Sequence, residues 1–471
     1  MRLSQVVAQV GGELAGDAGF VGVSTDSRTL QAGEWFVALR GERYDGHDHV
    51  AVALEKGASA LIVERLFPGV PVAQWVVADS LQALQALAVY WRQQCSGVRR
   101  FALTGSSGKT TTKEMLASML ATQGATHATR GNLNNQIGVP LTVLQMRPEH
   151  RFGVFELGAS HAGEITEIAR LIAPECVAIT NVGSAHLEGF GSREGIARAK
   201  AEIYAAVQPG GRAVLNRDDE FYPWCRQQAA HLHTVSVSLQ DPAAEVSVRG
   251  MQADASGCYR FEPLIEGKIF PWVQLPIMGK HNVLNACMAL AMAWYEPGLD
   301  PLGLLQGLAL MPGIPGRMHR ETFGKMTLID DTYNANPASV RSAIDVLAAQ
   351  QGKKILVLGD MAELGEGVRE EHRGVGEWAA MKKIDALYVV GDYAQWVAEG
   401  FANGAASGAK VLPDKQQLLA ELHTELQGVV SILVKGSRSS QMEDIVQGLS
   451  VQGLRQTTGQ PVRAPEDGSA C

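Results

Sequence analysis

The sequence lacks several features that would assign it to a special class of protein. No apolar run approaches the ~18 residues of a membrane span, which argues against a transmembrane protein. No basic region followed by an apolar stretch opens the chain, so we expect no signal peptide. Two cysteines never stand in C-x-x-C spacing, which argues against a structural zinc site and fits a reducing, cytoplasmic location. The six cysteines are scattered at positions 95, 176, 225, 258, 287 and 471.

An excess of positive charge is also missing. The formal net charge is −8, which argues against a protein that binds nucleic acid or an anionic membrane. Hydrophobic residues make up 46% of the chain and charged residues 19%, an ordinary globular composition. At 471 residues, the chain is long enough for about three domains.

Strand and helix patterns alternate along most of the chain, which predicts α/β domains with mostly parallel sheets. Strands are expected at 35–39, 60–63, 99–103, 152–156, 177–181, 354–358, 386–390 and 431–434, with helices at 81–94, 113–120, 193–204 and 281–295. A β-rich stretch covers 245–275, and the turn-prone MPGIPGR at 311–317 suggests a boundary. We predict domains at 1–80, 81–313 and 314–455, followed by a disordered tail at 456–471.

The most informative motif is TGSSGKTTT at 104–112, between a predicted strand and a predicted helix. A glycine-rich turn that leads into a helix N-terminus directs backbone N–H groups and partial positive charge at a phosphate. Lys109 would reach the β- and γ-phosphates, and the Thr110 hydroxyl would hold Mg²⁺.

The spacing departs from the usual phosphate-loop motif because Leu103 precedes the first glycine, Gly105. A glycine-rich turn without a ligand is the alternative interpretation. The other loop residues expected at ATP are Ser106, Ser107, Gly108 and Thr111.

Two residues follow predicted strands of the same block, at the sheet edge where α/β proteins bind ligands. Glu156 ends one strand and is a natural Mg²⁺ ligand, unless it is a surface or helix-capping residue. His186 lies in the next glycine-rich loop, where it could bind metal or contact a reacting carboxylate, or be structural. Lys200 stands on a predicted helix, where a solvated lysine is the simpler interpretation.

Polar residues in later segments are weaker candidates. Asn282 opens a predicted helix, where its amide could pair with a base edge or cap the helix. Arg317, in PGRM, could hold a phosphate. Asp330 and Asp331, in LIDDTYNANP, could bind ribose hydroxyls, although composition alone predicts that they are turn residues.

These motifs, taken together, resemble those of the Mur ligase family, the ATP-dependent amide-forming enzymes of bacterial cell-wall precursor synthesis. The similarity rests on TGSSGKTT, NLNNQIGVP, ELGASHAGEI, NVGSAHLEGFGS, AKAEI, GKHNVLNA, PGRM and DDTYNANP, which occur in order up to about residue 450. NLNNQIGVPLT, HLEGFGS, GDMAELG and LVKGSRS are most similar to the members that add the dipeptide D-Ala-D-Ala. The Asp-Asn-Pro-Arg motif of members that add diaminopimelate or lysine is absent.

The resemblance implies three domains and a reaction. They are an N-terminal α/β UDP-substrate domain, a central P-loop ATPase-like domain with a mostly parallel sheet, and a C-terminal Rossmann-like domain. ATP and Mg²⁺ would be the cofactors, and UDP-N-acetylmuramoyl-tripeptide and D-Ala-D-Ala the substrates. The tripeptide carboxylate would be activated as an acyl phosphate before the amine attacks it. We expect a cytoplasmic monomer.

The resemblance also implies roles for single residues. Lys109 matches the triphosphate contact, Thr110 and Glu156 match Mg²⁺ ligands, and His186 matches a residue near a second Mg²⁺ and the acyl phosphate. Lys200 matches the lysine that family members carbamylate, which turns a cation into an anionic metal ligand. The remaining matches are Asn282 to the adenine contact, Arg317 and Asp331 to phosphate and ribose contacts, Asn135 to a substrate contact, and Ser27 and Arg28 to UDP contacts.

Two other functions stay open at this point. A related carboxylate–amine ligase of the folylpolyglutamate synthase type would share the ATP site, but the block before the phosphate loop argues against it. A regulatory P-loop NTPase would need neither an amine acceptor nor a modified Lys200.

Overall fold

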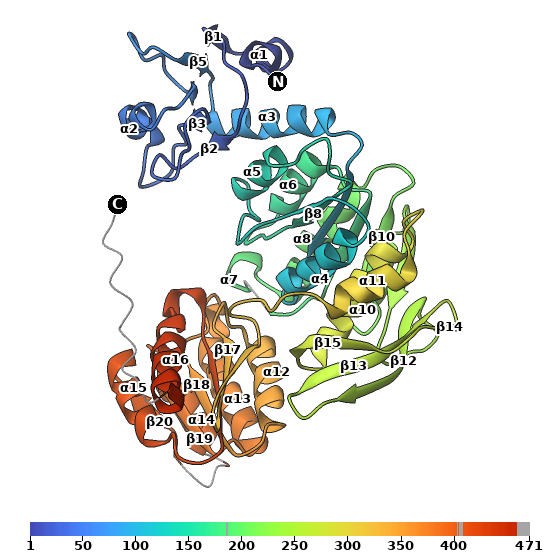
Figure 1. The fold of residues 1–471 in the computed structure, drawn as a ribbon, viewed down its shortest axis with the longest axis vertical. Coiled ribbons are helices and arrows are strands. Elements are labelled where there is room, and N and C mark those ends of the chain that lie inside the picture. The colour runs from blue at the N-terminus through green and yellow to red at the C-terminus, as the bar shows by residue number, and fades with distance from the viewer. Residues whose placement is uncertain (185–186, 403, 405–407, 459–471) are drawn as a thin grey trace.

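The computed structural model describes residues 1–184, 187–402, 404 and 408–458, and it contains three α/β units that follow one another along the long axis (Figure 1). Each unit has its own sheet, and most neighbouring strands in the three sheets run parallel. The predicted α/β class with three domains is therefore confirmed. In these ranges no helix combines the length and the apolar character that crossing a membrane requires.

The N-terminal unit is a five-stranded sheet with the order β1-β5-β4-β3-β2, in which only β1 is antiparallel. Its strands are β1 (Glu13–Ala15), β2 (Val23–Ser24), β3 (Trp35–Val37), β4 (Ala60–Val63) and β5 (Ala73–Val76), and its helices are α1 (Leu3–Val10) and α2 (Val50–Glu55). The strand predicted at 35–39 ends at Val37 because the backbone turns there, with Leu39 N donating to Val37 O at 3.1 Å.

Helix α3 (Ser80–Gln94) follows the N-terminal sheet and packs between that unit and the next. Asp79 fixes its start, since its Oδ1 accepts from the N–H groups of Leu81 and Gln82 at 2.8 and 2.9 Å. Trp91 Nε1 donates to Met146 O at 2.9 Å, across the α3–α5 contact. We propose 1–80, 81–313 and 314–455 as the three domains.

The central unit contains a ten-stranded sheet, with β7-β8-β6-β9-β10-β11-β12 parallel and β13, β14 and β15 antiparallel. The strands are β6 (Arg99–Thr104), β7 (Thr126–Ala128), β8 (Phe152–Glu156), β9 (Cys176–Ile179), β10 (Arg212–Asn216), β11 (His233–Val237), β12 (Val246–Ala253), β13 (Cys258–Ile265), β14 (Lys268–Ile269) and β15 (Val273–Met278). Because β8, β6 and β9 are parallel neighbours, their carboxyl ends lie at one edge of the sheet.

One helix of this unit is almost completely enclosed. Side chains on all sides of α10 (His281–Trp294) are buried, and they pack with α4, α11 and the sheet. The other helices are α4 (Lys109–Ala121), α5 (Gly138–Leu144), α6 (Glu164–Ile172), α7 (Leu187–Phe190), α8 (Arg193–Ala201), α9 (Tyr222–Gln228) and α11 (Pro301–Ala309). The helix predicted at 193–204 ends at Ala201 and continues as a 3-10 helix over Glu202–Ala206.

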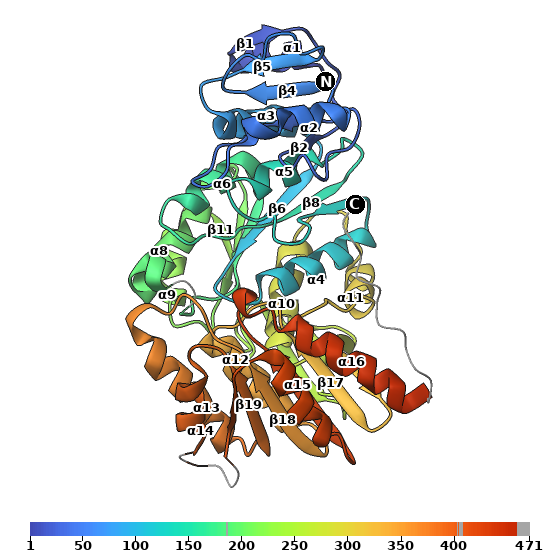
Figure 2. The same cartoon turned by 90° about the vertical axis from the view of Figure 1, so that its left-hand side faces the viewer.

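The C-terminal unit is a six-stranded sheet with the order β16-β17-β21-β18-β19-β20, in which only β16 is antiparallel. Helices cover both faces of this sheet (Figure 2). The strands are β16 (His319–Phe323), β17 (Met326–Asp331), β18 (Lys353–Leu358), β19 (Ala386–Val390), β20 (Lys410–Leu412) and β21 (Val430–Lys435). The helices are α12 (Pro337–Ala348), α13 (Val368–Met381), α14 (Ala394–Ala402), α15 (Lys415–Thr424) and α16 (Glu443–Thr458).

Two sequence-based expectations are wrong in this unit. Asp330 and Asp331 are the last residues of β17 and not turn residues, because β17 pairs with β16 on one side and β21 on the other. Helix α16 extends to Thr458, past the start of the tail predicted to be disordered, because its earlier turns are anchored by buried Ile445 and Leu449. The rest of that tail, 459–471, lies outside the described residues.

Candidate active site

The phosphate loop joins β6 to α4, as predicted, and two glycines make its shape possible. A Cβ on Gly105 would lie 1.8 Å from Thr180 Oγ1, so only glycine fits this close approach. Gly108 precedes the helix with φ +75°, and a Cβ there would lie 2.5 Å from Asn285 Oδ1. Helix α4 therefore begins at Lys109, four residues earlier than predicted, with its N-terminus at the carboxyl edge of the sheet.

The first half of the loop is fastened to the segment that follows β9. Asn181 Oδ1 accepts hydrogen bonds from the N–H groups of Ser106 and Ser107 at 3.1 and 2.9 Å. Thr180 Oγ1 donates to Ser107 O at 2.6 Å, and Gly183 N donates to Ser106 Oγ at 2.9 Å. Because Asn181 already binds these two N–H groups, the donors best placed for a phosphate are those of the first turn of α4.

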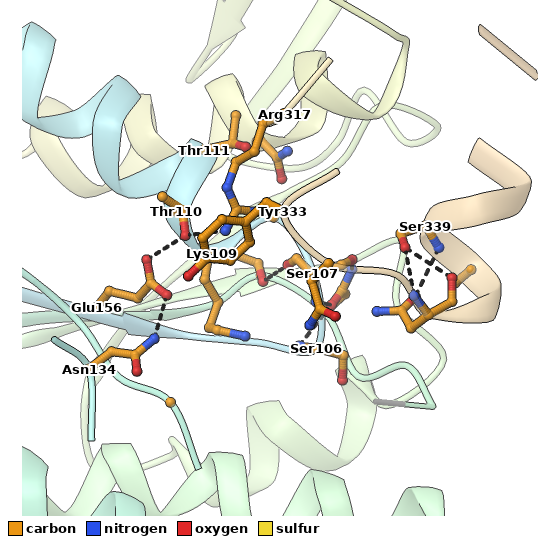
Figure 3. Close-up of a pocket in the computed structure, with 18 of the residues that line it drawn as sticks. Ser106, Ser107, Lys109, Thr110, Thr111, Asn134, Glu156, Arg317, Tyr333 and Ser339 are labelled. Atoms are coloured by element: carbon orange, nitrogen blue, oxygen red, sulfur yellow. Dashed lines mark hydrogen bonds between the residues drawn. The ribbon is translucent and has the colours of Figure 1, made fainter. Parts of the chain in front are cut away.

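Lys109 and Thr110, on that first turn, place charge and a hydroxyl in the same cavity. Lys109 Nζ donates to Gly105 O at 2.7 Å. Burial lowers the pKa of Lys109, and Glu156 opposes this shift while Arg317 adds to it. The Thr110 hydroxyl donates to Glu156 Oε2 at 2.7 Å (Figure 3).

Glu156 is held at the end of β8 and is only 2% exposed, so it is not a surface residue. Its second carboxylate oxygen, Oε1, accepts from Asn134 Nδ2 at 2.8 Å, and its backbone N–H donates to Thr129 Oγ1 at 3.0 Å. A buried carboxylate beside a threonine hydroxyl offers oxygen ligands of the kind that Mg²⁺ prefers, and Mg²⁺ commonly needs only one or two carboxylates besides phosphate. The donor set therefore fits Mg²⁺.

The C-terminal unit supplies the opposite wall. Arg317 Nη2 donates to Thr110 Oγ1 at 2.7 Å, and the guanidinium lies over the Tyr333 ring with Cζ 4.1 Å from the centroid (Figure 3). The cavity between the two units measures about 570 Å³, a size typical of small-molecule sites. The central unit lines it with the phosphate loop, Glu156 and the start of α10, and the third unit with the segments around Arg317 and Tyr333.

Asn282 lines the same cavity from α10 and is 3% exposed. Its Nδ2 donates to Met278 O at 2.6 Å, and its Oδ1 accepts from Asn285 Nδ2 at 2.9 Å. The helix N-cap is Lys280, so the alternative that Asn282 caps the helix is wrong. An amide has more than two hydrogen-bonding positions, so these bonds orient Asn282 and leave it able to bind a base.

Asp331 is buried at the end of β17 and is paired with Lys435, the last residue of the neighbouring strand β21. Lys435 Nζ donates to Asp331 Oδ2 at 2.6 Å, and Met318 N donates to Oδ1 at 3.2 Å. Lys435 also donates to Asn334 O at 2.8 Å. Both side chains of this pair line the cavity.

Three family models match consecutive parts of this chain. They are described as "Mur ligase family, catalytic domain" at 20–92, "Mur ligase middle domain" at 103–293 and "Mur ligase, glutamate ligase domain" at 316–438. A protein of Escherichia coli named UDP-N-acetylmuramoyl-tripeptide–D-alanyl-D-alanine ligase is 39% identical over 96% of this chain and 99% of its own. A Bacillus subtilis protein of the same name is 36% identical, over 91% of this chain and 93% of its own.

The chain belongs to the Mur ligase family. The Mur ligase neighbours among solved structures include a crystal structure of MurF from Acinetobacter baumannii, with a TM-score of 0.87 and 37% identity, covering 95% of this chain and 98% of that one. A MurF ligase of Thermotoga maritima, solved in complex with ADP, has a TM-score of 0.80 and 28% identity, covering 92% of this chain and 98% of that one. A Mycobacterium tuberculosis folylpolyglutamate synthase, at 16% identity and a TM-score of 0.58, shares only the fold.

Lys200, on α8 of this Mur ligase, is not the solvated lysine of the simpler interpretation. It is 2% exposed, and burial together with the positive charge of Lys109 lowers its pKa well below the usual range. A buried lysine with a lowered pKa readily gives the neutral amine that a carbamate requires. His186, the other candidate for a metal site, lies outside the described residues.

Not every predicted site residue of this Mur ligase lies at the cavity. Asn135 lines it, and its Oδ1 accepts from the N–H groups of Ile137 and Gly138 at 3.2 and 2.9 Å. Ser27 and Arg28 belong to the N-terminal unit, and the cavity lining includes neither. Arg28 is exposed and pairs with Asp26, lowering the pKa of that carboxyl to about 2.

Several polar residues of the Mur ligase cavity were not among the predicted site residues. Those with contacts described above include Asn134, Asn181, Tyr333 and Lys435. Each stands in a motif on which the family resemblance rests. Asn134 is next to Asn135, Lys435 ends β21, and Asn181 and Tyr333 each lie two positions after the end of a strand. A search for polar residues at the carboxyl ends of consecutive strands would have found Asn181 and Lys435.

Proposed function

We propose that this protein is an ATP-dependent ligase that joins D-Ala-D-Ala to the terminal carboxylate of UDP-N-acetylmuramoyl-tripeptide, forming the pentapeptide precursor of peptidoglycan. One observation carries the proposal: a chain 39% identical over nearly its full length to a protein of that name has a cavity that combines a phosphate loop, a buried carboxylate and Arg317. The reaction proceeds through an acyl phosphate on the tripeptide carboxylate.

The residues of the cavity are suited to the charge problem of this reaction. A carboxylate and a phosphate repel each other, so the site must supply positive charge that is fixed in place before they meet. Lys109, Arg317 and the N–H groups of the first turn of α4 supply it. Thr110 and Glu156 would hold Mg²⁺, which neutralises phosphate charge when bound, and Lys200, which is buried but not part of the cavity lining, would join them once carbamylated.

The remaining contacts are assigned by position in the motifs. Asn282 binds the adenine, Asp331 binds the ribose, and Arg317 binds a phosphate from the third domain. Asn135 contacts the peptide substrate, and His186 lies near a second Mg²⁺. Ser27 and Arg28 contact the UDP group in the N-terminal domain.

We also propose a quaternary state and a location. The protein acts as a monomer, a proposal supported by the fact that one chain supplies both walls of the cavity. A UDP-linked substrate and ATP are both cytoplasmic metabolites, so the protein acts in the cytoplasm. Light scattering on the purified protein tests the first statement, because a stable dimer would contradict it.

Phosphate release tests the function directly. With ATP and Mg²⁺, release should require both the UDP-tripeptide and D-Ala-D-Ala. The assay is run with UDP-tripeptides that end in meso-diaminopimelate and in L-Lys, and the product is identified by mass. Release of phosphate without either peptide substrate would instead indicate a regulatory NTPase, and activity with folate and glutamate would indicate the related ligase class.

A further inference from the structure

The segment that connects the central and third domains is fastened on both sides of Arg317. Gly316 N donates to Asp330 Oδ2 at 3.0 Å, and Met318 N donates to Asp331 Oδ1 at 3.2 Å. The end of β17 thus holds the backbone before and after Arg317, although this segment has no regular secondary structure. Backbone fastening alone does not fix the long Arg317 side chain, which has several rotatable bonds.

The Tyr333 ring contacts the Arg317 side chain, which the backbone hydrogen bonds do not fix. Its N–H donates to Gly316 O at 3.1 Å, and a Cβ on Gly316 would lie 3.2 Å from Tyr333 Cβ, so the two loops approach closely. The Arg317 Cζ lies 4.1 Å from the ring centroid, the shortest cation–ring distance in the described part of the chain. Figure 3 shows the ring beside the guanidinium, within the cavity.

We propose that Tyr333 is a positioning residue that holds the Arg317 guanidinium against its ring and thereby directs the N–H edge at the nucleotide phosphates. A guanidinium is planar, so stacking one face on a ring leaves the N–H donors of its edge free to bind. Arg317 Nη2 already points at Thr110 Oγ1, 2.7 Å away, on the first turn of the phosphate-loop helix. This inference rests on the proposed ATP-dependent function, because it assigns the phosphate as the target of Arg317.

The contact predicts how substitutions at the two positions combine. Tyr333→Phe retains the ring, whereas Tyr333→Met and Tyr333→Leu retain apolar bulk without it. Tyr333 is only partly buried, so all three chains should fold. Arg317→Ala removes the side chain that the ring positions. If the ring acts only through the guanidinium, removing the ring from the Arg317→Ala protein should change nothing further.

The experiment measures the dissociation constant of a non-hydrolysable ATP analogue and the KM values for ATP and D-Ala-D-Ala. Tyr333→Phe should stay within about twofold of wild type, and Tyr333→Met and Tyr333→Leu should bind the analogue roughly three- to twenty-fold more weakly. KM for ATP should rise with little change in KM for D-Ala-D-Ala. The Tyr333→Met/Arg317→Ala protein should bind like Arg317→Ala alone. A melting temperature for each variant separates loss of folding from loss of binding.

Inorganic tripolyphosphate, used as a competitor of the analogue, separates phosphate positioning from base stacking. Loss of the ring should weaken tripolyphosphate and the ATP analogue by similar factors. Weakening of the analogue alone would mean that Tyr333 stacks on the base, which would overturn the inference. Wild-type affinity for the analogue in Tyr333→Met would also overturn the inference. So would a loss of affinity on adding Tyr333→Met to Arg317→Ala that equals the loss Tyr333→Met causes in the wild-type protein. If wild-type protein bound no nucleotide at all, the proposed function itself would fail.

Discussion

Arg317 Nη2 and Thr110 Oγ1 are joined by a 2.7 Å hydrogen bond, although 207 positions separate the two residues in the chain. The same threonine hydroxyl donates to Glu156, so a cation from the third domain, a hydroxyl of the phosphate loop and a buried carboxylate form one connected group. Thr110 and Glu156 meet within the central domain, and Arg317 is brought to them from the third domain. The arrangement makes the relative position of the two domains part of the site, and it allows each contribution to be tested separately.

Lys109→Ala should reduce ligation by ~10³-fold or more, because no other side chain on the first turn of α4 supplies a positive charge to the transferred phosphate. The rate of phosphate release with both peptide substrates measures the effect. Lys268→Ala, an exposed lysine on β14, is the matched control and should be unaffected. Turnover of Lys109→Ala within tenfold of wild type would refute the phosphate-loop assignment.

Glu156→Gln should lower activity by roughly 100-fold or more and shift the Mg²⁺ titration to higher concentration, because the carboxylate charge is lost without loss of volume. Asn134→Ala should have a smaller effect and shift the Mg²⁺ titration by about 10- to 100-fold in concentration, since Asn134 orients the carboxylate through a 2.8 Å hydrogen bond. The Mg²⁺ dependence of the rate is the measurement. A titration that is unchanged in Glu156→Gln would remove this residue from the metal site.

Lys200→Ala should be inactive at ordinary Mg²⁺ if the carbamate supplies an anionic ligand. A small carboxylic acid should then restore part of the activity, and removal of bicarbonate and CO₂ should depress the wild-type rate reversibly. Arg198→Ala, on the same helix, is the control that should respond to neither treatment. A fully active Lys200→Ala enzyme would contradict the carbamate.

His127 should make the central domain sensitive to acid. Burial lowers its pKa to about 4 from 6.5, despite the 2.8 Å hydrogen bond from Nε2 to Thr142 O. The unfolded chain therefore binds more protons than the folded one between these values, so stability is fully present above the unfolded pKa and falls as the pH drops toward the folded one. Across this pH range the free energy of unfolding falls by about 3 kcal/mol.

The measurement compares acid-induced changes in melting temperature for wild type and His127→Gln. The variant should lose less stability than wild type across this window, and the exposed His161→Gln should behave like wild type. Equal pH profiles for wild type and His127→Gln would refute the assignment.

The sequence predicted those parts of the site whose position follows from neighbouring residues along the chain. Lys109 and Thr110 follow from a strand, a glycine turn and a helix in succession, and Glu156 from its place at the end of an apolar strand. The same reasoning located most strands, because buried parallel strands appear as short apolar runs. The prediction of a turn was wrong at Asp330 and Asp331, because pairing with two neighbouring strands overrides the local composition there.

The parts that were missed depend on which strands are neighbours. Asn181 reaches the phosphate loop because β9 pairs with β6, and Lys435 reaches Asp331 because β21 pairs with β17. Neither pairing joins strands that are adjacent in the sequence, so a local pattern can show that each residue lies at a strand end but not which residues it contacts. The stacking of Arg317 on Tyr333 likewise requires the positions of two loops that only the folded domain brings together.

The enclosure of α10 constrains how the chain can fold as it is synthesised. The apolar face of α4, with Met115, Leu116 and Met119, is covered by residues of α10, which the ribosome adds more than 160 positions later. Until residue 294 has emerged, the phosphate-loop helix must remain partly uncovered to water or to a chaperone. The nucleotide site is therefore among the last parts of the central domain to become native, and a nascent chain that stalls before this point presents an apolar surface prone to aggregation.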